Sequence, residues 1–354
     1  MSVPAERLVV IGASAGGIEA VQQLLAALPP DFPAAVMVVI HLGSGATSHL
    51  AEVLGRAGSL PVQAARDGQP LLAGQVYVSV PDHHLLVEGR HVAVRRGPHE
   101  NRFRPSVDAL FRSAAYTYTD RVIGVVLSGM LDDGTSGLWT ISQLGGVSVV
   151  QTPSDALYDS MPKSALAQMD VDYVLPVSNI GPLLNDLVRQ PRSFPTPPRE
   201  ERMDERELRR LELEVKAAAD SSSPSLEILK LGELSPLTCP ECHGVLVEVH
   251  EGRLIRYRCH TGHAYSASSL AVSVGESVER SLYQAMRALE EAVLLYGELE
   301  QHHKALGETE RAEHNRHQGA RALWFSQQVQ TMTSRTVADE QWPTLKPDEL
   351  PSQS

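Results

Sequence analysis

The sequence predicts an α/β protein with a doubly wound, mostly parallel sheet and an added β-hairpin, followed by a small zinc-ribbon-like module and α-helices. Up to about residue 190, apolar runs rich in β-branched residues alternate with amphipathic helical patterns. Such continuous apolar runs are typical of strands that are buried on both faces. A charged, Pro-rich stretch then follows, and all 3 cysteines lie beyond it. These observations separate a large first domain from a smaller C-terminal region.

The predicted strands of the first domain are the apolar runs 8–14, 34–42, 122–130, 146–151 and 172–176. Between them, Ile18–Leu28 and Val107–Tyr116 have the apolar spacing of helices. Residues 75–97 are expected to form the added hairpin, with a turn near Glu88 and Gly89.

The expected organisation has five parts. They are a first domain over 1–190, a linker with a charged helix over 191–236, a zinc-ribbon-like module over 237–265, a helical region over 266–332 and a disordered tail over 333–354. The charged helix, near 202–220, is expected to be solvated. The helical region carries a heptad stripe that favours either a hairpin with residues 314–331 or self-association. The stripe consists of Val278, Leu282, Ala285, Leu289, Ala292, Tyr296 and Leu299.

Charge and hydropathy argue against a nucleic-acid-binding protein and against a membrane-spanning or secreted protein. The formal net charge is −12 and the isoelectric point is near 5.6, which argues against nucleic acid as the main partner. No apolar run approaches the length of a membrane span, and the N-terminus lacks a signal-peptide pattern. The odd number of cysteines fits a reducing compartment, so we expect a cytoplasmic protein that is not inserted into a membrane.

A glycine-rich loop holding a serine follows the first strand. As a dinucleotide-binding loop, Gly12-x-Ser14-x-x-Gly17 carries a serine where a glycine is needed, and His41 ends the second strand where an acidic residue is expected. The same loop also has the pattern Gly-x-Ser-x-Gly, in which small neighbours hold a serine hydroxyl clear on a tight strand-to-helix turn. The second interpretation predicts a nucleophile.

Three predicted strand ends supply the parts of a hydrolase. Ser14 follows the first strand, His41 ends the second, and Asp132 and Asp133 lie in a turn after the strand 122–130. Because the carboxyl ends of parallel strands meet at one edge of a sheet, a nucleophile, a base and a carboxylate are expected together. The residues themselves leave open which aspartate orients the histidine.

Five blocks then occur in order, and together they resemble the catalytic domain of the chemotaxis protein-glutamate methylesterase (CheB-type) family. The blocks are IGASAGGIEAVQQLLAALP, VIHL, NRFRPSVDALF, GVVLSGMLDDGTSG and MPKSAL, and they cover about residues 5–190. The first strand begins near residue 7, so we expect no receiver domain of the kind that precedes the catalytic domain in familiar members.

The resemblance implies roles for individual residues. Ser14 matches the nucleophile, His41 the general base and Asp133 the carboxylate. The backbone amides of Ala15 and Met130 are the implied oxyanion-hole donors.

The block around RPSVD is implied to lie near the cleft. Arg104 and Pro105 are its cleft candidates, whereas Ser106 and Asp108 are interpreted as residues that start a helix.

The implied reaction is hydrolysis of glutamyl methyl esters on chemoreceptor helices, with glutamine deamidation as a further activity. No cofactor is implied for this chemistry, and methylated membrane receptors are the implied partners. Two alternatives remain open, namely hydrolysis of another protein ester or amide, and a non-catalytic signalling scaffold.

The cysteines form a metal-binding pattern. Cys239, Cys242, Cys259 and His263 have the spacing C-x2-C and C-x3-H, which suits tetrahedral Zn²⁺ in a structural site. The residues between the two pairs are expected to form a β-hairpin that brings the pairs together. His243 and His260 are rival ligands for His263.

Overall fold

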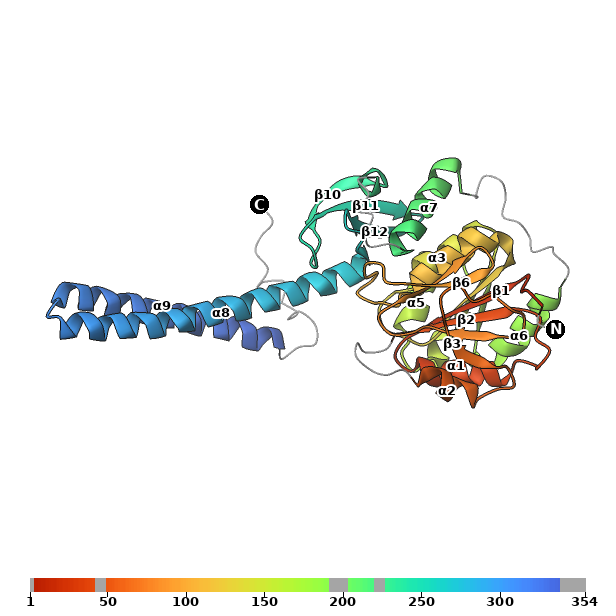
Figure 1. Cartoon of the computed structure of the whole chain (residues 1–354), viewed down its shortest axis with the longest axis horizontal. Coiled ribbons are helices and arrows are strands. Elements are labelled where there is room, and N and C mark those ends of the chain that lie inside the picture. The colour runs from red at the N-terminus through yellow and green to blue at the C-terminus, as the bar shows by residue number, and fades with distance from the viewer. Residues whose placement is uncertain (1–2, 42–48, 191–202, 220–226, 338–354) are drawn as a thin grey trace. The chain divides into compact units, whose positions relative to one another are not determined.

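The computed structural model describes residues 3–41, 49–190, 203–219 and 227–337 (Figure 1). The first part of the chain forms a seven-stranded parallel sheet in the order β3-β4-β2-β1-β7-β8-β9. Its strands are β1 (Leu8–Ala13), β2 (Ala35–Ile40), β3 (Val62–Ala64), β4 (Val76–Val78), β7 (Val122–Val126), β8 (Val147–Gln151) and β9 (Tyr173–Leu175).

Helices cover both faces of this sheet, as expected for a doubly wound fold. The helices are α1 (Gly17–Ala26), α2 (Leu50–Gly55), α3 (Val107–Tyr118), α4 (Thr135–Gln143), α5 (Ser160–Gln168) and α6 (Val177–Arg189). Short 3₁₀ turns follow at η1 (Thr119–Arg121) and η2 (Pro153–Asp155). Because successive strand residues face opposite sides, two separate cores form. One contains α1, α2 and α6, and the other contains α3, α4 and α5.

The predicted hairpin is shorter than expected. Only β5 (His84–Glu88) and β6 (His91–Arg95) pair as an antiparallel hairpin, with the turn at Gly89. Residues 76–78 instead form β4, which pairs in parallel with β2 and β3. Residues 76–78 were therefore predicted as a strand but with the wrong partner, and β3 was not predicted, because its three residues carry little periodicity.

A second, antiparallel sheet follows in the order β10-β11-β12-β13. Its strands are β10 (Glu233–Thr238), β11 (Val245–Glu251), β12 (Leu254–Cys259) and β13 (Ala264–Ser266), preceded by α7 (Glu205–Ala219) and η4 (Ile228–Lys230). The sheet begins earlier than the start expected at residue 237, because Glu233 and Leu234 pair with β11 ahead of the first cysteine.

The charged helix α7 is not simply solvated, so the prediction of a solvated face was wrong for part of it. Leu211, Glu214, Ala217 and Ala218 are buried. Ala217 packs in a core with β11 and η4, and Ala218 packs against the β5–β6 hairpin. The predicted Pro-rich linker lies mostly outside the described residues.

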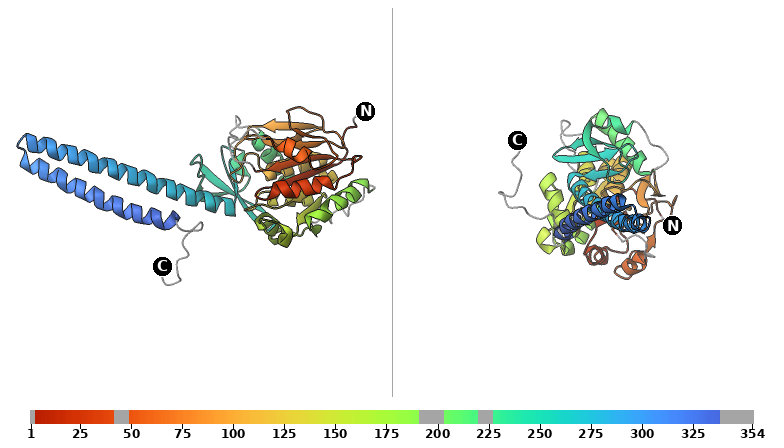
Figure 2. Two further views of the ribbon diagram at one scale, coloured as in Figure 1. Left: turned by 90° about the horizontal axis from the view of Figure 1, so that it is seen from below. Right: turned by 90° about the vertical axis from the view of Figure 1, so that its left-hand side faces the viewer.

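The chain divides into two compact units, Met1–Leu270 and Ala271–Ser354. Helix α8 (Ala267–Ala305) begins in the first unit, and α9 (Thr309–Val337) follows it. The two helices run side by side as a hairpin (Figure 2). The buried residues of α9 recur at heptad spacing and are small, namely Ala312, Asn315, Ala322, Ser326 and Thr333. Most of the predicted stripe on α8 is half-buried, but Val278 and Ala285 are exposed.

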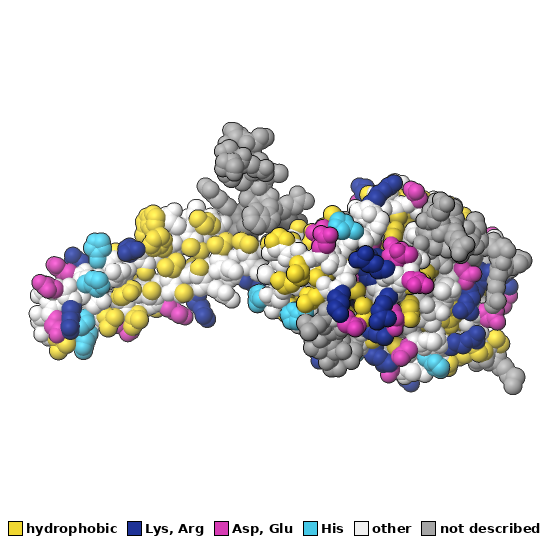
Figure 3. Space-filling model, turned by 90° about the horizontal axis from the view of Figure 1, so that it is seen from above, with side chains coloured by type: hydrophobic (Ala, Val, Ile, Leu, Met, Phe, Trp, Pro, Cys, Tyr) yellow, Lys and Arg dark blue, Asp and Glu magenta, His cyan; other side chains and the backbone are white. Residues whose placement is uncertain are grey.

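Large apolar side chains remain on the outside of this helical hairpin. Leu294, Leu295, Trp324 and Phe325 are all more than two-fifths exposed, and hydrophobic patches along the helices are visible in Figure 3. None of the helices in the described segments combines the length and apolarity that a bilayer crossing requires. The predicted tail was to begin at residue 333, but residues 333–337 belong to α9, so that boundary was wrong; residues 338–354 of the tail lie outside the described residues.

Candidate active site

Ser14 sits on the tight turn that joins β1 to α1. Its backbone N–H donates to Ser128 O on the loop after β7, at 2.9 Å, and its carbonyl accepts from Gly17 N. The turn requires a left-handed residue at Gly16, where φ is +68°. The Ser128 hydroxyl donates to Ala15 O at 2.8 Å and fixes the loop further. The hydroxyl of Ser14 is therefore presented at the carboxyl edge of the sheet.

His41 connects Ser14 to Asp133. The imidazole Nδ1 lies 3.2 Å from Ser14 Oγ, and Nε2 lies 2.8 Å from Asp133 Oδ2. The side chains of His41 and Asp133 are 3% and 1% exposed, so water scarcely screens this contact. The ring is turned relative to the usual serine-protease triad, in which Nε2 faces the serine and Nδ1 the carboxylate. The order serine, imidazole, carboxylate is unchanged.

Asp133 is the carboxylate that faces the ring, which settles the choice left open by the sequence. Its neighbour Asp132 instead accepts a hydrogen bond from the Ser266 hydroxyl at 2.7 Å. Burial raises the pKa of Asp132. The two aspartates therefore point to different partners, although they are adjacent in the turn after β7.

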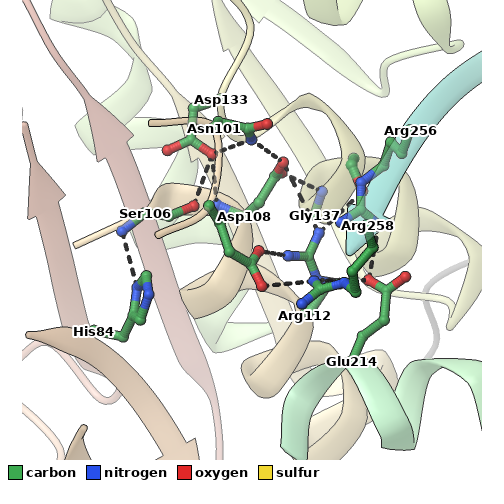
Figure 4. Close-up of polar contacts among 12 residues, drawn as sticks. His84, Asn101, Ser106, Asp108, Arg112, Asp133, Gly137, Glu214, Arg256 and Arg258 are labelled. Atoms are coloured by element: carbon green, nitrogen blue, oxygen red, sulfur yellow. Dashed lines mark hydrogen bonds and ion pairs between the residues drawn. The ribbon is translucent and has the colours of Figure 1, made fainter. Parts of the chain in front are cut away.

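Asp133 is held by several donors besides His41 (Figure 4). Oδ1 accepts from Asn101 Nδ2 at 2.9 Å, Ser106 Oγ at 2.9 Å and Asp108 N at 3.1 Å. Oδ2 accepts from Val107 N at 2.7 Å. Burial alone raises the pKa of Asp133, but the hydrogen bonds and charge of His41, with those from Asn101 and Val107, outweigh it and lower the pKa to about 2. Asp133 is thus ionised at neutral pH.

Ser106 and Asp108 stand at the start of helix α3 as expected, but their side chains also contact the residues around the triad. Ser106 occupies the N-cap position, yet its hydroxyl makes no capping bond and donates to Asp133 instead. Asp108 accepts from Asn101 Nδ2 at 2.8 Å and from the amides of Gly134 and Gly137 at the start of α4. Burial and then the charge of Asp133 raise the pKa of Asp108 to about 7.

Phe103 stacks on the imidazole of His41. The ring centroids are 3.7 Å apart and the planes differ by 9°. Because Phe103 covers one face of the ring while Ser14 and Asp133 engage its two nitrogens, the imidazole is restrained in plane and in rotation.

Both oxyanion-hole candidates lie at the same edge of the sheet. Ala15 N precedes the first turn of α1, where backbone N–H groups are free and the helix end is positive. Met130 follows Gly129, whose own N–H donates to Tyr158 O at 2.9 Å. Among hydrogen bonds between described residues, neither Ala15 N nor Met130 N is a donor.

The cleft candidates Arg104 and Pro105 are adjacent to this site in sequence. Arg104 directs its guanidinium to Asp82 and to Gly97 O, the latter at 2.7 Å, and it contacts none of the triad atoms within the described residues. Pro105 is buried. A role for either residue in a substrate cleft stays a prediction.

The four predicted metal ligands converge in the second sheet. Cys239, Cys242, Cys259 and His263 place their ligand atoms within 4.8 Å of one another. The Cys242 and Cys259 sulfurs are 3.6 Å apart, and His263 Nδ1 lies 3.5 Å from Cys259 Sγ and 3.7 Å from Cys239 Sγ. A tetrahedral Zn²⁺ with ordinary bond lengths requires ligand separations of about 3.5–3.8 Å. The donor set and its spacing therefore fit zinc.

The rival ligands are placed elsewhere. His243 is exposed, and neither it nor His260 belongs to a closely spaced group of ligand atoms among the described residues. His263 also belongs to a second group with His99 and Glu241. Glu241 accepts from His99 Nδ1 at 2.9 Å, so it lies directly outside the cysteine cluster.

Asn101 and Phe103 are the site residues that the sequence did not single out. Both lie within the block NRFRPSVDALF, which was recognised as a unit. Only the position of this block offered a signal, because an asparagine or a phenylalanine in a loop has no distinctive spacing.

Comparisons with known proteins agree with this architecture. Residues 9–184 match the CheB methylesterase family. A curated relative from Leptospira interrogans is 38% identical over 176 residues, which are 49% of this chain and 91% of the relative. A relative from Anaeromyxobacter dehalogenans, named protein-glutamate methylesterase/protein-glutamine glutaminase 2, is 41% identical over 182 residues, 51% of this chain and 53% of that protein.

A solved structure gives the same result for the fold. The catalytic domain of the Thermotoga maritima CheB methylesterase is 34% identical, has a TM-score of 0.50, and is covered over 98% of its length by 51% of this chain. With the serine, histidine and aspartate placed at the edge of the matching sheet, this chain belongs to the CheB methylesterase family.

Proposed function

We propose that this chain is a protein-glutamate methylesterase that uses Ser14 as nucleophile, His41 as general base and Asp133 as orienting carboxylate. The observation that carries the proposal is the unbroken contact from Ser14 Oγ through the His41 ring to Asp133, in a fold of this family. The names of the relatives support the choice of reaction, since they combine methylesterase and glutaminase activities.

The reaction begins when Ser14 Oγ attacks the carbonyl carbon of a glutamyl methyl ester and His41 Nδ1 takes the hydroxyl proton. The methoxy group leaves with that proton as methanol, which leaves an acyl-enzyme on Ser14. His41 then deprotonates a water molecule that attacks the acyl carbon. The bond to Ser14 Oγ breaks, His41 returns the proton to Ser14, and the glutamate side chain is released. Asp133 remains ionised throughout and stabilises the imidazolium.

Negative charge develops on the carbonyl oxygen of the substrate during both acylation and deacylation. We assign its stabilisation to the backbone N–H groups of Ala15 and Met130, which lie beside the nucleophile and make no hydrogen bond with other described residues. One such donor contributes about 3–4 kcal/mol to lowering the barrier.

The direct test is release of methanol from methylated receptor fragments. We expect Ser14→Ala to abolish release and to leave the thermal unfolding midpoint almost unchanged. The matched control is Ser178→Ala, which removes an exposed hydroxyl that contacts only its neighbour Asn179 among the described residues. Wild-type turnover by the Ser14→Ala variant would refute the assignment, and so would an inactive wild type on every methylated fragment.

Chemoreceptor helices carrying methylated glutamates are the partners in this proposal. Deamidation of glutamine follows the same steps, with ammonia leaving in place of methanol, and the relatives' names favour it as a second activity. Ammonia release from receptor fragments that carry glutamine distinguishes the two. Turnover of other protein esters but not receptor esters would favour the alternative hydrolase, and no turnover would favour a scaffold.

The catalytic steps use only side chains and backbone of this chain, so the proposal includes no cofactor for the chemistry. We further propose that Cys239, Cys242, Cys259 and His263 hold a structural Zn²⁺. Four protein ligands leave no open position for substrate, and metal binding supplies folding energy to a small sheet. Metal analysis of the purified protein tests this, and about one equivalent of zinc is expected.

A cytoplasmic location completes the proposal, supported by the free cysteines. We also propose that the helical hairpin of α8 and α9 pairs with a second copy. Trp324 and Phe325 are exposed on α9, and two such hairpins make a four-helix bundle. Sedimentation of the wild type and of Trp324→Glu tests this, with a dimer expected only for the wild type.

A further inference from the structure

Asn101 connects the triad carboxylate to the C-terminal part of the first unit. Its Nδ2 donates to Asp133 at 2.9 Å and to Asp108 at 2.8 Å. Its Oδ1 accepts from Ser266 N at 2.8 Å. Ser269 Oγ lies 3.2 Å from Oδ1 and 3.2 Å from Ser266 O, and these two acceptors share its single proton. Both donor positions of the amide are therefore used, and its oxygen faces two groups that can donate. The NH₂ group of Asn101 thus contacts residues of the family domain, whereas its carbonyl oxygen contacts residues of β13 and α8.

The backbone of Asn101 depends on the same segment. Asn101 N donates to Ala264 O at 2.8 Å, and Ala264 N donates to His99 O at 3.2 Å, so residues 99–101 pair with the start of β13. Asn101 has a φ of +49°, a left-handed conformation that asparagine tolerates better than most residues. Its side chain is buried, with 3% of its surface exposed.

Buried ion pairs fix the second sheet against this region (Figure 4). Glu100, next to Asn101, accepts from Arg258 of β12 at 2.6 Å and also pairs with Arg112 of α3. Glu214 of α7 pairs with Arg256 at 2.7 Å and with Arg112 at 3.2 Å. Burial without a partner is costly for such charges, so moving the second sheet and α7 away from α3 would leave Arg112 and Glu100 without these partners.

Ser266, Ser269, Arg256 and Arg258 lie beyond residues 9–184, which match the family. We propose that Asn101 is a positioning residue for Asp133, and that Ser266 and Ser269 of the β13–α8 junction hold its amide in the orientation that presents the NH₂ group to the carboxylate. This inference rests on the proposed methylesterase function. The β13–α8 junction thereby becomes a structural part of the active site.

The physical reason is the orientation of the amide. A rotated Asn101 would present its carbonyl oxygen to the ionised carboxylate of Asp133 and would repel it. The N–H of Ser266 favours the productive orientation because a backbone amide can only donate, so it requires the carbonyl oxygen of Asn101 to face it. The hydroxyl of Ser269 adds a second contact that holds the amide in place. Without them, the amide loses its fixed position, and Asp133 loses a donor that holds Oδ1 while Oδ2 engages His41.

The test is a double-mutant cycle on the full-length protein, with kcat and KM for methyl ester hydrolysis as readouts. Asn101→Ala is expected to lower kcat by about 10- to 100-fold, as for a lost hydrogen bond to a charged group. Ser269→Ala is expected to lower kcat by about threefold. KM should not change in either variant. In the double variant, kcat should match Asn101→Ala alone within about twofold, because Ser269 acts through Asn101.

The matched control is Ser281→Ala, which removes a hydroxyl on the exposed face of α8 that donates to Ser277 O within its own helix. A second readout needs no substrate, namely the downfield proton resonance of the His41 Nε2–H that faces Asp133. We expect this resonance to shift or broaden in Asn101→Ala and Ser269→Ala and to persist in Ser281→Ala.

The outcomes separate this inference from the proposed function. Losses in kcat that multiply in the double variant would overturn the inference that Ser269 acts through Asn101. An unchanged kcat and an unchanged resonance in Ser269→Ala would also overturn it. A wild type without esterase activity would overturn the function alone, since the resonance still reports whether Ser269 and Asn101 position Asp133.

Discussion

The triad and the cysteine cluster lie in the same compact unit, but they hold their polar groups by different means. Asp133 is surrounded by side-chain and backbone donors that fix its charge without any ligand. The cluster instead brings three cysteines and His263 together, and its sulfur and nitrogen atoms face one another at 3.5–3.7 Å. Such a donor set suits a cation at its centre. The parallel sheet therefore provides a preformed site, whereas in the proposal the antiparallel sheet is stabilised by a metal.

Removal of the proposed metal is expected to have the largest effect. It should lower the stability of the antiparallel sheet and leave the parallel sheet unchanged. Chelation should destabilise β10–β13, because the free energy of zinc binding is part of the folding free energy of a small sheet. Hydrogen exchange should rise in β11 and β12 and stay slow in β1, β2 and β7. Equal protection of β11 and β12 after complete metal removal would contradict the difference between the two sites.

Asp133→Asn tests the other side of the comparison. An asparagine lacks the negative charge and presents a donor to groups that are themselves donors, so the imidazole loses its partner. A triad carboxylate changed in this way lowers kcat by about 10⁴-fold in a serine protease, and we expect a fall of about 10³- to 10⁴-fold here.

The matched control for this variant is Asp132→Asn, which removes the adjacent carboxylate that faces Ser266. We expect less than about a tenfold loss in kcat, as for a single hydrogen bond. Similar losses in both variants would mean that the two aspartates are equivalent and would contradict the observed division of partners.

Acid should weaken the protein through Asp133. Its pKa is lowered from 3.8 to about 2 in the folded state, so the stabilisation is present above pH 4 and is lost as the pH falls towards 2. The shift corresponds to about 2 kcal/mol. Urea unfolding of wild type and Asp133→Asn should show a difference in unfolding free energy that shrinks by about this amount between pH 5 and pH 2. A constant difference would show that Asp133 is not stabilised as an anion.

Phe103→Leu gives the smallest expected effect. The variant removes the stacked aromatic ring, and such contacts contribute about 0.5–1.5 kcal/mol. We expect kcat to fall by about two- to tenfold, while Phe103→Tyr should retain most of the activity. An undiminished kcat in Phe103→Leu would mean that the stacking does not restrain the imidazole.

The sequence predicted the features that depend on local patterns, but not those that depend on contacts between distant segments. The buried strands, the glycine turn at Ser14 and the strand ends at His41 and Asp133 follow from local patterns, and the family blocks identified Asp133 as the carboxylate. The role of Asn101 could not be predicted, because its acceptor contacts come from Ser266 and Ser269, 165 and 168 residues further along the chain. Only the tertiary structure brings these together.

Helix α7 shows a second feature that the sequence could not predict, namely the burial of a charged residue. Helix α7 has the composition of a solvated helix, yet Glu214 is buried against arginines of α3 and β12. A glutamate in a charged run carries no sign that it will be buried, since its arginine partners are distant in sequence. The cysteine spacing, by contrast, predicted four residues that do converge, because such spacings are typical of local turns that bring ligand atoms together.

Reaction with a fluorophosphonate, mapped by peptide mass spectrometry, tests the central claim most directly. The reagent labels only serines that a neighbouring base activates, so the account predicts one adduct per chain, on Ser14, and almost none in His41→Gln. An unlabelled wild type, an adduct on another serine, or undiminished labelling of Ser14 in His41→Gln would contradict the account.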